Sequence, residues 1–241
     1  MLEERDKTKV ESLPLDCPVC GCFFFSWELR SFGYENRRTD FRPQYADENP
    51  MKSYFHTCPE CHFCAEQDYY HLELSDEQKG TLKTRLAELF KKHGKSMPRS
   101  LAARCLYAAL VAELLQRMGL IFELPFDRAQ SFVQPFWWAG PDELEKYGKL
   151  AIKRLAEAMD EMDPRSEDTL YVIYMLGEIS RRIGKDEDAK MHFERLLGMR
   201  AKRQNDSNKF LFELAIQQMK EPKDELPEES LNPYVKVSED K

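Results

Sequence analysis

The spacing of apolar residues along this 241-residue chain changes near Tyr70. Before it, apolar positions fall in short aromatic segments separated by polar, turn-rich stretches. Residues 23–30 are aromatic-rich and partly alternating, which predicts a strand, and residues 53–57 predict a second one. After Tyr70, apolar residues recur every three to four positions, and this period predicts helices.

Helical periodicity recurs in six segments. The first opens on a capping box with Ser75 as its N-cap and Gln78 three residues later, and Gly94 marks its expected end. The second runs from near Pro98 to Gly119 with Ser96 as a candidate N-cap, and its apolar residues cover most of its circumference, which predicts burial on more than one side. The other four are predicted over residues 141–162, 166–183, 186–203 and 206–219.

Residues 120–140 interrupt this helical order. They interleave prolines and large aromatic residues with few charges. A solvated loop would not be so aromatic, so we expect a long connection that packs over the helices or over the N-terminal region. An exposed aromatic anchor for a partner is the alternative.

The two ends of the chain lack apolar periodicity. Residues 1–14 are charged and predict a flexible arm, and residues 220–241 are rich in proline and glutamate and predict a disordered acidic tail. Between them we expect a ribbon over residues 15–72 and a helical domain over residues 75–219. The predicted fold class is therefore α+β, mostly α, with short antiparallel strands preceding a helical domain.

Composition narrows the class of protein. Hydrophobic residues make up 42% of the chain and charged residues 33%, as in ordinary globular domains. No apolar run reaches membrane-spanning length, and the charged N-terminus lacks the apolar core of a secretory signal. A net charge of −7 argues against broad binding to nucleic acid or anionic lipid. Seven cysteines favour a reducing compartment, so we expect a cytoplasmic protein.

Four of the cysteines form two Cys-x-x-Cys pairs, Cys17 with Cys20 and Cys58 with Cys61. Such pairs on tight turns supply the ligands of a tetrahedral zinc ion, and we expect structural Zn²⁺ here. Four sulfurs leave no open coordination position, which argues against catalysis at the metal. The intervening segment is longer than usual, but loop closure grows only by about 0.6 kcal/mol per doubling of length. Iron in a rubredoxin-like site is the alternative metal.

Cys22 and Cys64 stand just outside the two pairs. They are either small buried side chains beside the metal, or alternate ligands and reversibly oxidised thiols. His56 and His62 lie close enough in sequence to replace a ligand, although the thiols already complete the shell. Cys105 lies on an apolar helical face and is expected in the core.

Residues 176–196 have the spacing of a tetratricopeptide repeat. Gly177 would allow two antiparallel helices to approach, Gly184 would turn the chain, and Ala189 and Phe193 would interlock the pair. A plain helical bundle is the alternative. In the repeat register, four side chains would face a concave groove suited to a peptide: Tyr171, Tyr174, Glu178 and Arg181. The two tyrosines would otherwise pack against a neighbouring helix pair.

A small basic and aromatic face is a second candidate binding surface. Its residues would be Arg30, Arg37, Arg38 and Arg42, with Phe32, Tyr34 and Phe41 between them. Acidic side chains outnumber basic ones in residues 17–71, which is unfavourable for the phosphate contacts that dominate nucleic-acid affinity.

The N-terminal third resembles a bacterial family known as domain of unknown function 2225. The resemblance is carried by Cys17-Pro18-Val19-Cys20-Gly21, Asp40-Phe41-x-Pro43-x-Tyr45, Asn49-Pro50, Tyr54 and Cys58-Pro59-x-Cys61. It implies a split zinc ribbon joined to tetratricopeptide-like helices, and it implies no activity. The chain departs from the expected pattern at Cys22, His62 and Cys64, and in the aromatic segment 120–140.

No phosphate-binding loop, nucleophile elbow or His-Glu-x-x-His motif is present, so we expect no enzyme. The expected function is a cytoplasmic zinc-binding adaptor that docks a protein or peptide on its helices. The alternatives are a thiol redox sensor that uses Cys22 and Cys64, and a nucleic-acid-associated ribbon that uses residues 30–42.

Overall fold

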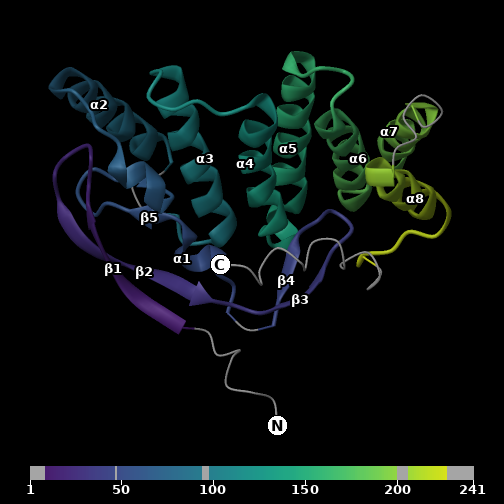
Figure 1. Cartoon of the computed structure of the whole chain (residues 1–241), viewed down its shortest axis with the longest axis horizontal. Helices are drawn as coiled ribbons and strands as arrows, with labels where there is room; N and C mark the ends of the chain where they lie inside the picture. The colour runs from purple at the N-terminus through teal and green to yellow at the C-terminus, as the bar shows by residue number, and fades with distance from the viewer. Residues whose placement is uncertain (1–8, 47, 94–97, 200–205, 227–241) are drawn as a thin grey trace, which may run out of the picture. The chain divides into compact units, whose positions relative to one another are not determined.

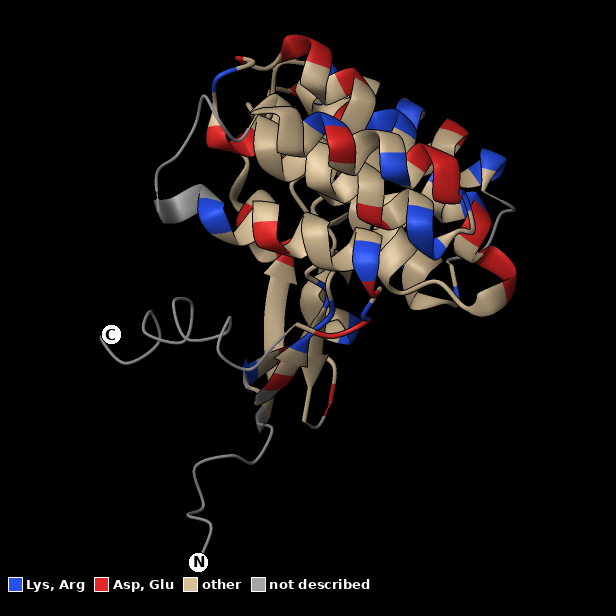
Figure 2. Cartoon of the chain, turned by 90° about the vertical axis from the view of Figure 1, so that its right-hand side faces the viewer, with Lys and Arg blue, Asp and Glu red and all other residues tan. Residues whose placement is uncertain are grey.

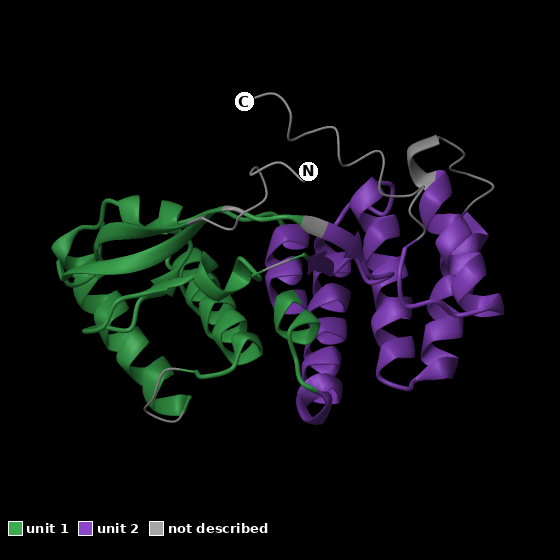
Figure 3. Ribbon diagram, turned by 90° about the horizontal axis from the view of Figure 1, so that it is seen from below, with its two compact units in different colours: residues 1–33, 46–124, 134–140 green, residues 34–45, 125–133, 141–241 purple. Residues whose placement is uncertain are grey.

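The computed structural model describes residues 9–46, 48–93, 98–199 and 206–226 (Figure 1). The chain divides into two compact units, each built from separate segments (Figure 3). Unit 1 comprises Met1–Gly33, Ala46–Leu124 and Gln134–Gly140; unit 2 comprises Tyr34–Tyr45, Pro125–Val133 and Pro141–Lys241. The expected class, α+β and mostly α, is confirmed.

Unit 1 begins with an antiparallel hairpin of β1 (Lys9–Asp16) and β2 (Phe23–Ser31). Leu13 and Leu15 of β1 are buried, whereas Phe25 of β2 is 65% exposed. The strand expected over residues 23–30 is confirmed. The flexible arm is wrong from Lys9 onward, because the apolar residues of β1 give one face of the hairpin to the core; residues 1–8 lie outside the described residues.

A compact segment follows around the second cysteine pair. It contains α1 (Met51–Tyr54), β5 (His56–Thr57), β6 (Cys64–Ala65) and the 3-10 helix η2 (Gln67–His71). The strand expected over residues 53–57 is therefore confined to two residues, because the chain from Pro50 forms a turn of helix. The buried hydroxyl of Tyr70 donates to the carbonyls of His56 and Phe63 at 2.8 and 3.0 Å, which holds β5 and β6 together.

Two long helices complete the core of unit 1, α2 (Asp76–Lys92) and α3 (Leu101–Arg117). The capping box of Ser75 and Gln78 is confirmed, whereas α3 is capped by Ser100 rather than Ser96; Ser96 and Gly94 lie outside the described residues. Apolar residues of both helices share one core with the cysteines. The boundary expected near residue 72 therefore does not separate the cysteine region from these helices.

The aromatic segment 120–140 is also helical rather than a long connection. Helix α4 (Pro125–Trp137) begins with Pro125 at its first turn, where the missing N–H costs nothing. Phe132 and Phe136 are buried, while Phe122, before the helix, is 83% exposed. The prolines that favoured a loop interpretation thus start the helix and, at Pro135, lie in its last turn.

Besides the larger part of α4, unit 2 contains four helices within the described residues, α5 (Pro141–Glu161), α6 (Glu167–Arg182), α7 (Asp186–Met199) and α8 (Asp206–Lys220). A Cβ at Gly177 of α6 would lie 2.6 Å from a ring carbon of Phe193 in α7, so the expected close approach of these helices occurs. Gly184, with φ +75°, ends α6 and turns the chain into α7. Among the described residues, none of the helices combines the length and apolar character that a membrane crossing needs.

Two extended segments complete unit 2. The hairpin of β3 (Tyr34–Arg37) and β4 (Pro43–Tyr45) comes from the long segment between the cysteine pairs. Residues 221–226 follow α8, and Glu225 bridges Arg38 in antiparallel fashion. The disordered tail expected from residue 220 is therefore wrong as far as Leu226, which is buried; residues 227–241 lie outside the described residues.

Candidate metal centre

The four sulfurs of Cys17, Cys20, Cys58 and Cys61 lie within 4.8 Å of one another. The Sγ atoms of Cys17 and Cys61 are 3.4 Å apart, and those of Cys20 and Cys58 are 3.5 Å apart. All four thiols are free of disulfides. Sulfurs at about 2.3 Å from a tetrahedral metal would be about 3.8 Å apart, so the arrangement fits a metal ion with little adjustment.

Each pair lies on the same kind of turn. In the first, the amide of Cys17 donates to the carbonyl of Cys22 at 3.0 Å and that of Gly21 to Cys17 at 2.9 Å. In the second, Cys58 donates to Phe63 at 2.9 Å and His62 to Cys58 at 3.1 Å. Gly21 and His62 occupy the same place in the two turns, with φ of 72° and 61°. The turns therefore aim both thiol pairs at one point.

His62 adopts a backbone conformation that favours glycine, and a contact compensates for it. Its ring stacks on Phe90 of α2, with centroids 3.7 Å apart and an interplanar angle of 18°. The second turn is therefore attached to the helix through this side chain.

The centre lies in an apolar environment. Cys58 is fully buried and Cys17 is 2% exposed, and both belong to the core that includes α2 and α3. The hydrogen bond between Cys17 and Cys61 lowers the pKa of Cys17 to about 5, whereas burial raises the pKa of Cys58 to about 12. Burial thus opposes a set of four thiolates, and a divalent cation at their centre would offset that cost.

The outer cysteines and the histidines are not part of the four-sulfur group. Cys22 is partly buried and its Sγ lies 3.6 Å from the carbonyl of Phe23, while Cys64 is fully buried in the core and burial raises its pKa to about 11. The Nδ1 of His56 is hydrogen-bonded to the hydroxyl of Ser26 at 2.8 Å. Cys105 is 1% exposed in α3, as expected for a core residue.

The arginines of the expected basic face are divided between the two units, and two of them, Arg30 and Arg38, make ion pairs. Arg30 belongs to unit 1 and pairs with Glu11 and Glu28. Arg38 belongs to unit 2 with Arg37 and Arg42, and pairs with the buried carboxylate of Asp40 at 2.6 Å. Figure 2 shows acidic and basic residues interleaved along the helices. The expected face is thus not formed as one basic surface within either unit.

The four residues expected to line a groove do lie together, but the chain's own residues cover them. Tyr174 and Glu178 are fully buried, and Tyr174 donates its hydroxyl proton to the carbonyl of Thr39 at 2.9 Å. The ring of Tyr171 stacks on Phe41 at 4.9 Å, and Arg181 pairs with Glu178. The expectation of an open surface here is therefore wrong, because the segment after β3 packs onto α6.

Sequence reasoning missed Thr39, Asp40 and Gln218, which are buried at 0, 0 and 3% exposure. Thr39 and Asp40 come from a polar, turn-rich stretch, and Gln218 is a polar residue near the end of α8, so apolar periodicity gives no sign that they are buried. Phe41, an aromatic residue in a polar stretch, was the feature of the sequence that could have indicated burial of this segment. Its φ of 63° places its ring against α6.

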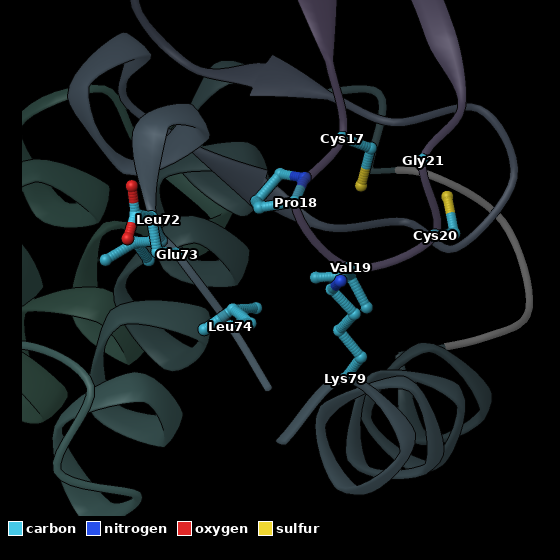
Figure 4. A pocket seen from close by; sticks show the side chains of 9 residues that line it. All are labelled: Cys17, Pro18, Val19, Cys20, Gly21, Leu72, Glu73, Leu74 and Lys79. Atoms are coloured by element: carbon cyan, nitrogen blue, oxygen red, sulfur yellow. The ribbon is translucent and has the colours of Figure 1, made fainter. Parts of the chain in front are cut away.

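One open pocket of about 540 Å³ lies beside the first cysteine turn (Figure 4). The side chains of Leu74 and Lys79 line it together with Val19. Glu73 and Lys79 are the charged groups of its lining, and Cys17 and Cys20 lie at its edge.

A family model described as an uncharacterized protein conserved in bacteria matches residues 13–222. Comparison with curated proteins and with solved structures gave no match. The matched region contains both cysteine pairs and all the helices that the structure describes.

Proposed function

The chain belongs to this bacterial family, domain of unknown function 2225, and we propose that it is a non-enzymatic adaptor with a structural zinc centre. The observation that carries the proposal is the four-sulfur group buried in a core formed with α2 and α3. Four thiolates complete the tetrahedral shell of Zn²⁺ and leave no position for a substrate or an activated water. The metal then stabilises unit 1 and takes no part in a reaction.

Zinc is preferred over other metals for this donor set. Soft thiolates at tetrahedral spacing suit Zn²⁺ and iron, and zinc needs no redox partner. Structural zinc contributes on the order of 10–16 kcal/mol in small domains. Thiolate ligands need a reducing environment, which supports a cytoplasmic location.

The docking part of the proposal is supported by unit 2. Side chains of its helices form hydrogen bonds with the main chain of extended segments, as helical docking proteins hold peptides. The redox-sensor alternative gains no support, because Cys64 is fully buried and Cys22 is only partly exposed. The nucleic-acid alternative gains none either, because two of its arginines, Arg30 and Arg38, are already paired with carboxylates.

Elemental analysis of the full chain tests the zinc centre. We expect about one zinc per chain, lost in Cys58→Ser and kept in the matched control Cys105→Ser, because Cys105 lies in the core outside the group. Chelation should lower the melting temperature of the wild-type chain. A chain that folds equally well without metal would contradict the proposal.

Cross-linking of the full chain in its native host tests docking. We expect a discrete protein to be cross-linked in stoichiometric amount, and equally so in Cys22→Ser, because the proposed docking does not use a reactive thiol. Cross-linking to nucleic acid or to a small molecule in place of a protein would contradict the adaptor proposal.

A further inference from the structure

Residues 223–226, here called the strap, lie along the edge of β3 as a bound peptide would. The amide of Thr39 donates to the carbonyl of Asp224 at 3.0 Å, and the amide of Leu226 donates to the carbonyl of Arg37 at 2.9 Å. Glu225 lies opposite Arg38 in an antiparallel bridge. The strap thus adds a short strand to the β3–β4 hairpin, which is a common way to bind an extended peptide.

The surface that receives the strap, here called the strap site, also holds its main chain through side chains. The strap site consists of residues 36–39 and Gln44 from the β3–β4 region, and of Glu178, Arg181, Arg182 and Gln218 from the helices. The buried amide of Gln218 donates to the carbonyl of Lys223 and accepts from its N–H, both at 2.8 Å. The hydroxyl of Thr39 lies 3.0 Å from the same carbonyl. These bonds hold a peptide unit whatever its side chain.

The second and third strap positions are read by charge and polarity. The carboxylate of Asp224 accepts from Arg181 at 3.0 Å and lies 3.3 Å from Arg182. The carboxylate of Glu225 accepts from the side-chain amides of Asn36 and Gln44 at 3.3 and 3.2 Å. Donors therefore face both positions, and an acidic side chain suits each of them.

The charge of the surrounding cluster favours an acidic ligand. Apart from the strap, the guanidinium groups of Arg38, Arg181 and Arg182 share two buried carboxylates, those of Asp40 and Glu178. Without Asp224 the cluster therefore has three positive and two negative groups. This excess of positive charge attracts acidic segments and orients them.

The fourth strap position is apolar. Leu226 is 5% exposed, although it follows three polar residues at the end of the described chain. Burial of a leucine removes apolar surface from water, so this residue anchors the segment, and the exposed ion pairs contribute less to its affinity.

We propose that the strap site binds a short extended peptide of the pattern acidic, acidic, apolar from a partner protein, and that the strap occupies the site until such a peptide displaces it. This inference rests on the docking part of the proposed function and specifies its ligand. The strap follows the family-matched region, whereas the strap site lies within it.

A partner peptide can displace the strap only if the strap itself binds weakly enough to leave the site. The strap is joined to α8 by two residues, so its effective concentration at the site is on the order of millimolar or above. The side chain of Asp224 is 75% exposed, so solvent and competing peptides reach it. A free peptide should therefore bind measurably better when the strap is weakened.

The probe is a fluorescein-labelled synthetic peptide with the sequence of residues 221–228, titrated with full-length protein and followed by anisotropy. The opened variant carries Asp224→Ala with Leu226→Ala, and Glu221→Ala, an exposed change outside the strap, is its matched control. We expect the opened variant to bind the peptide at least about tenfold more tightly than the wild type and the control do. A peptide with lysine at the position of Asp224 should not bind, because that position faces Arg181 and Arg182.

In this titration, any of three outcomes would overturn the inference. The folded opened variant does not bind at millimolar peptide, a scrambled peptide binds equally well, or the wild-type and opened chains bind the peptide with equal affinity. Should the double variant fail to fold, Leu226→Ala alone keeps every polar contact and should show an intermediate gain. In the opened variant, Arg181→Ala should weaken binding of the acidic peptide. It should leave unchanged the affinity for a peptide with alanine at the position of Asp224.

The result is separable from that of the proposed function. Protein that holds about one zinc and cross-links a partner equally in wild-type and opened forms would support the adaptor and overturn the strap site. Protein that lacks zinc but binds the acidic peptide would overturn the zinc centre and support the strap site.

Discussion

His62 combines a backbone conformation suited to glycine with a stack on Phe90. The left-handed conformation costs a residue with a Cβ roughly 1–2 kcal/mol, and an aromatic stack returns about 0.5–1.5 kcal/mol. His62→Gly should therefore change the free energy of unfolding by less than about 1 kcal/mol, measured by urea denaturation.

The same substitution in a Phe90→Ala background separates the backbone strain at His62 from the ring stack on Phe90. With Phe90→Ala there is no stack to lose, so His62→Gly should become stabilising by about 1 kcal/mol. A His62→Gly change that costs the same in both backgrounds would mean that neither the stack nor the backbone strain acts as described.

Gly177 lies where α6 and α7 approach most closely. Gly177→Ala would place a Cβ 2.6 Å from the buried ring of Phe193, and we expect a loss of about 1–3 kcal/mol in unfolding free energy. Gly198→Ala in α7 is the matched control, because its Cβ would meet nothing within 4 Å and should be neutral or stabilising. Equal losses at both glycines would rule out the packing explanation.

At the residue scale, the four-cysteine group was predictable and the buried polar residues were not. Cys-x-x-Cys spacing restricts the geometry locally, so Cys17 and Cys58 could be assigned from the amino-acid sequence alone. Thr39 is buried because Glu178 accepts its hydroxyl proton at 2.7 Å from 139 residues away. Such a partner leaves no trace in the sequence around Thr39.

Strand β2 presents alternate aromatic rings to opposite sides. Phe24 packs against Tyr70, with centroids 5.8 Å apart, whereas Phe25 is 65% exposed. Phe24→Ala should therefore cost about 2 kcal/mol, while Phe25→Ala, its neighbour on the other face, should cost less than about 0.5 kcal/mol. Thermal unfolding followed by circular dichroism would show the difference. A larger loss at Phe25 would contradict the register of the hairpin.

At the element scale, the helices followed from periodicity, and their ends agree with expectation to within a few residues where caps were clear. Ser75 and Ser166 cap α2 and α6 with side-chain hydrogen bonds. The strands were harder to predict, because β5 and β6 have only two residues each. Hydrogen bonds from the hydroxyl of Tyr70, which lies outside both strands, help to hold them together. Helix α4 was missed because its prolines and aromatics resemble those of a loop.

For the whole molecule, acidification provides a test of the strap. Arg181, and then Arg182 and Arg38, hold the pKa of Asp224 below its usual value of 3.8. A lowered pKa means that this carboxylate stabilises the strap above about pH 3.8, and that the contribution is lost as the pH falls through the lower, folded value. The contribution of Asp224 to the protection of the Leu226 amide against hydrogen exchange should therefore stay constant from pH 6 to about pH 4 and fall as the pH is lowered further.

Asp224→Asn is the control for that experiment, because it keeps the shape of the side chain and removes its titration. Its Leu226 amide should be less protected at pH 6, and the further fall toward pH 3 should be smaller than in the wild type. An identical pH response in both proteins would assign the effect to other carboxylates of the cluster.

The β3–β4 hairpin belongs to unit 2 although it interrupts the sequence of unit 1. Thr39 bonds to Glu178 and to Asp224, 139 and 185 residues later. On the ribosome, the hairpin therefore emerges long before the helix and the strap that bury it. Unit 2 can close only after residue 224 has left the exit tunnel, so the hairpin has to remain soluble while the helices are made.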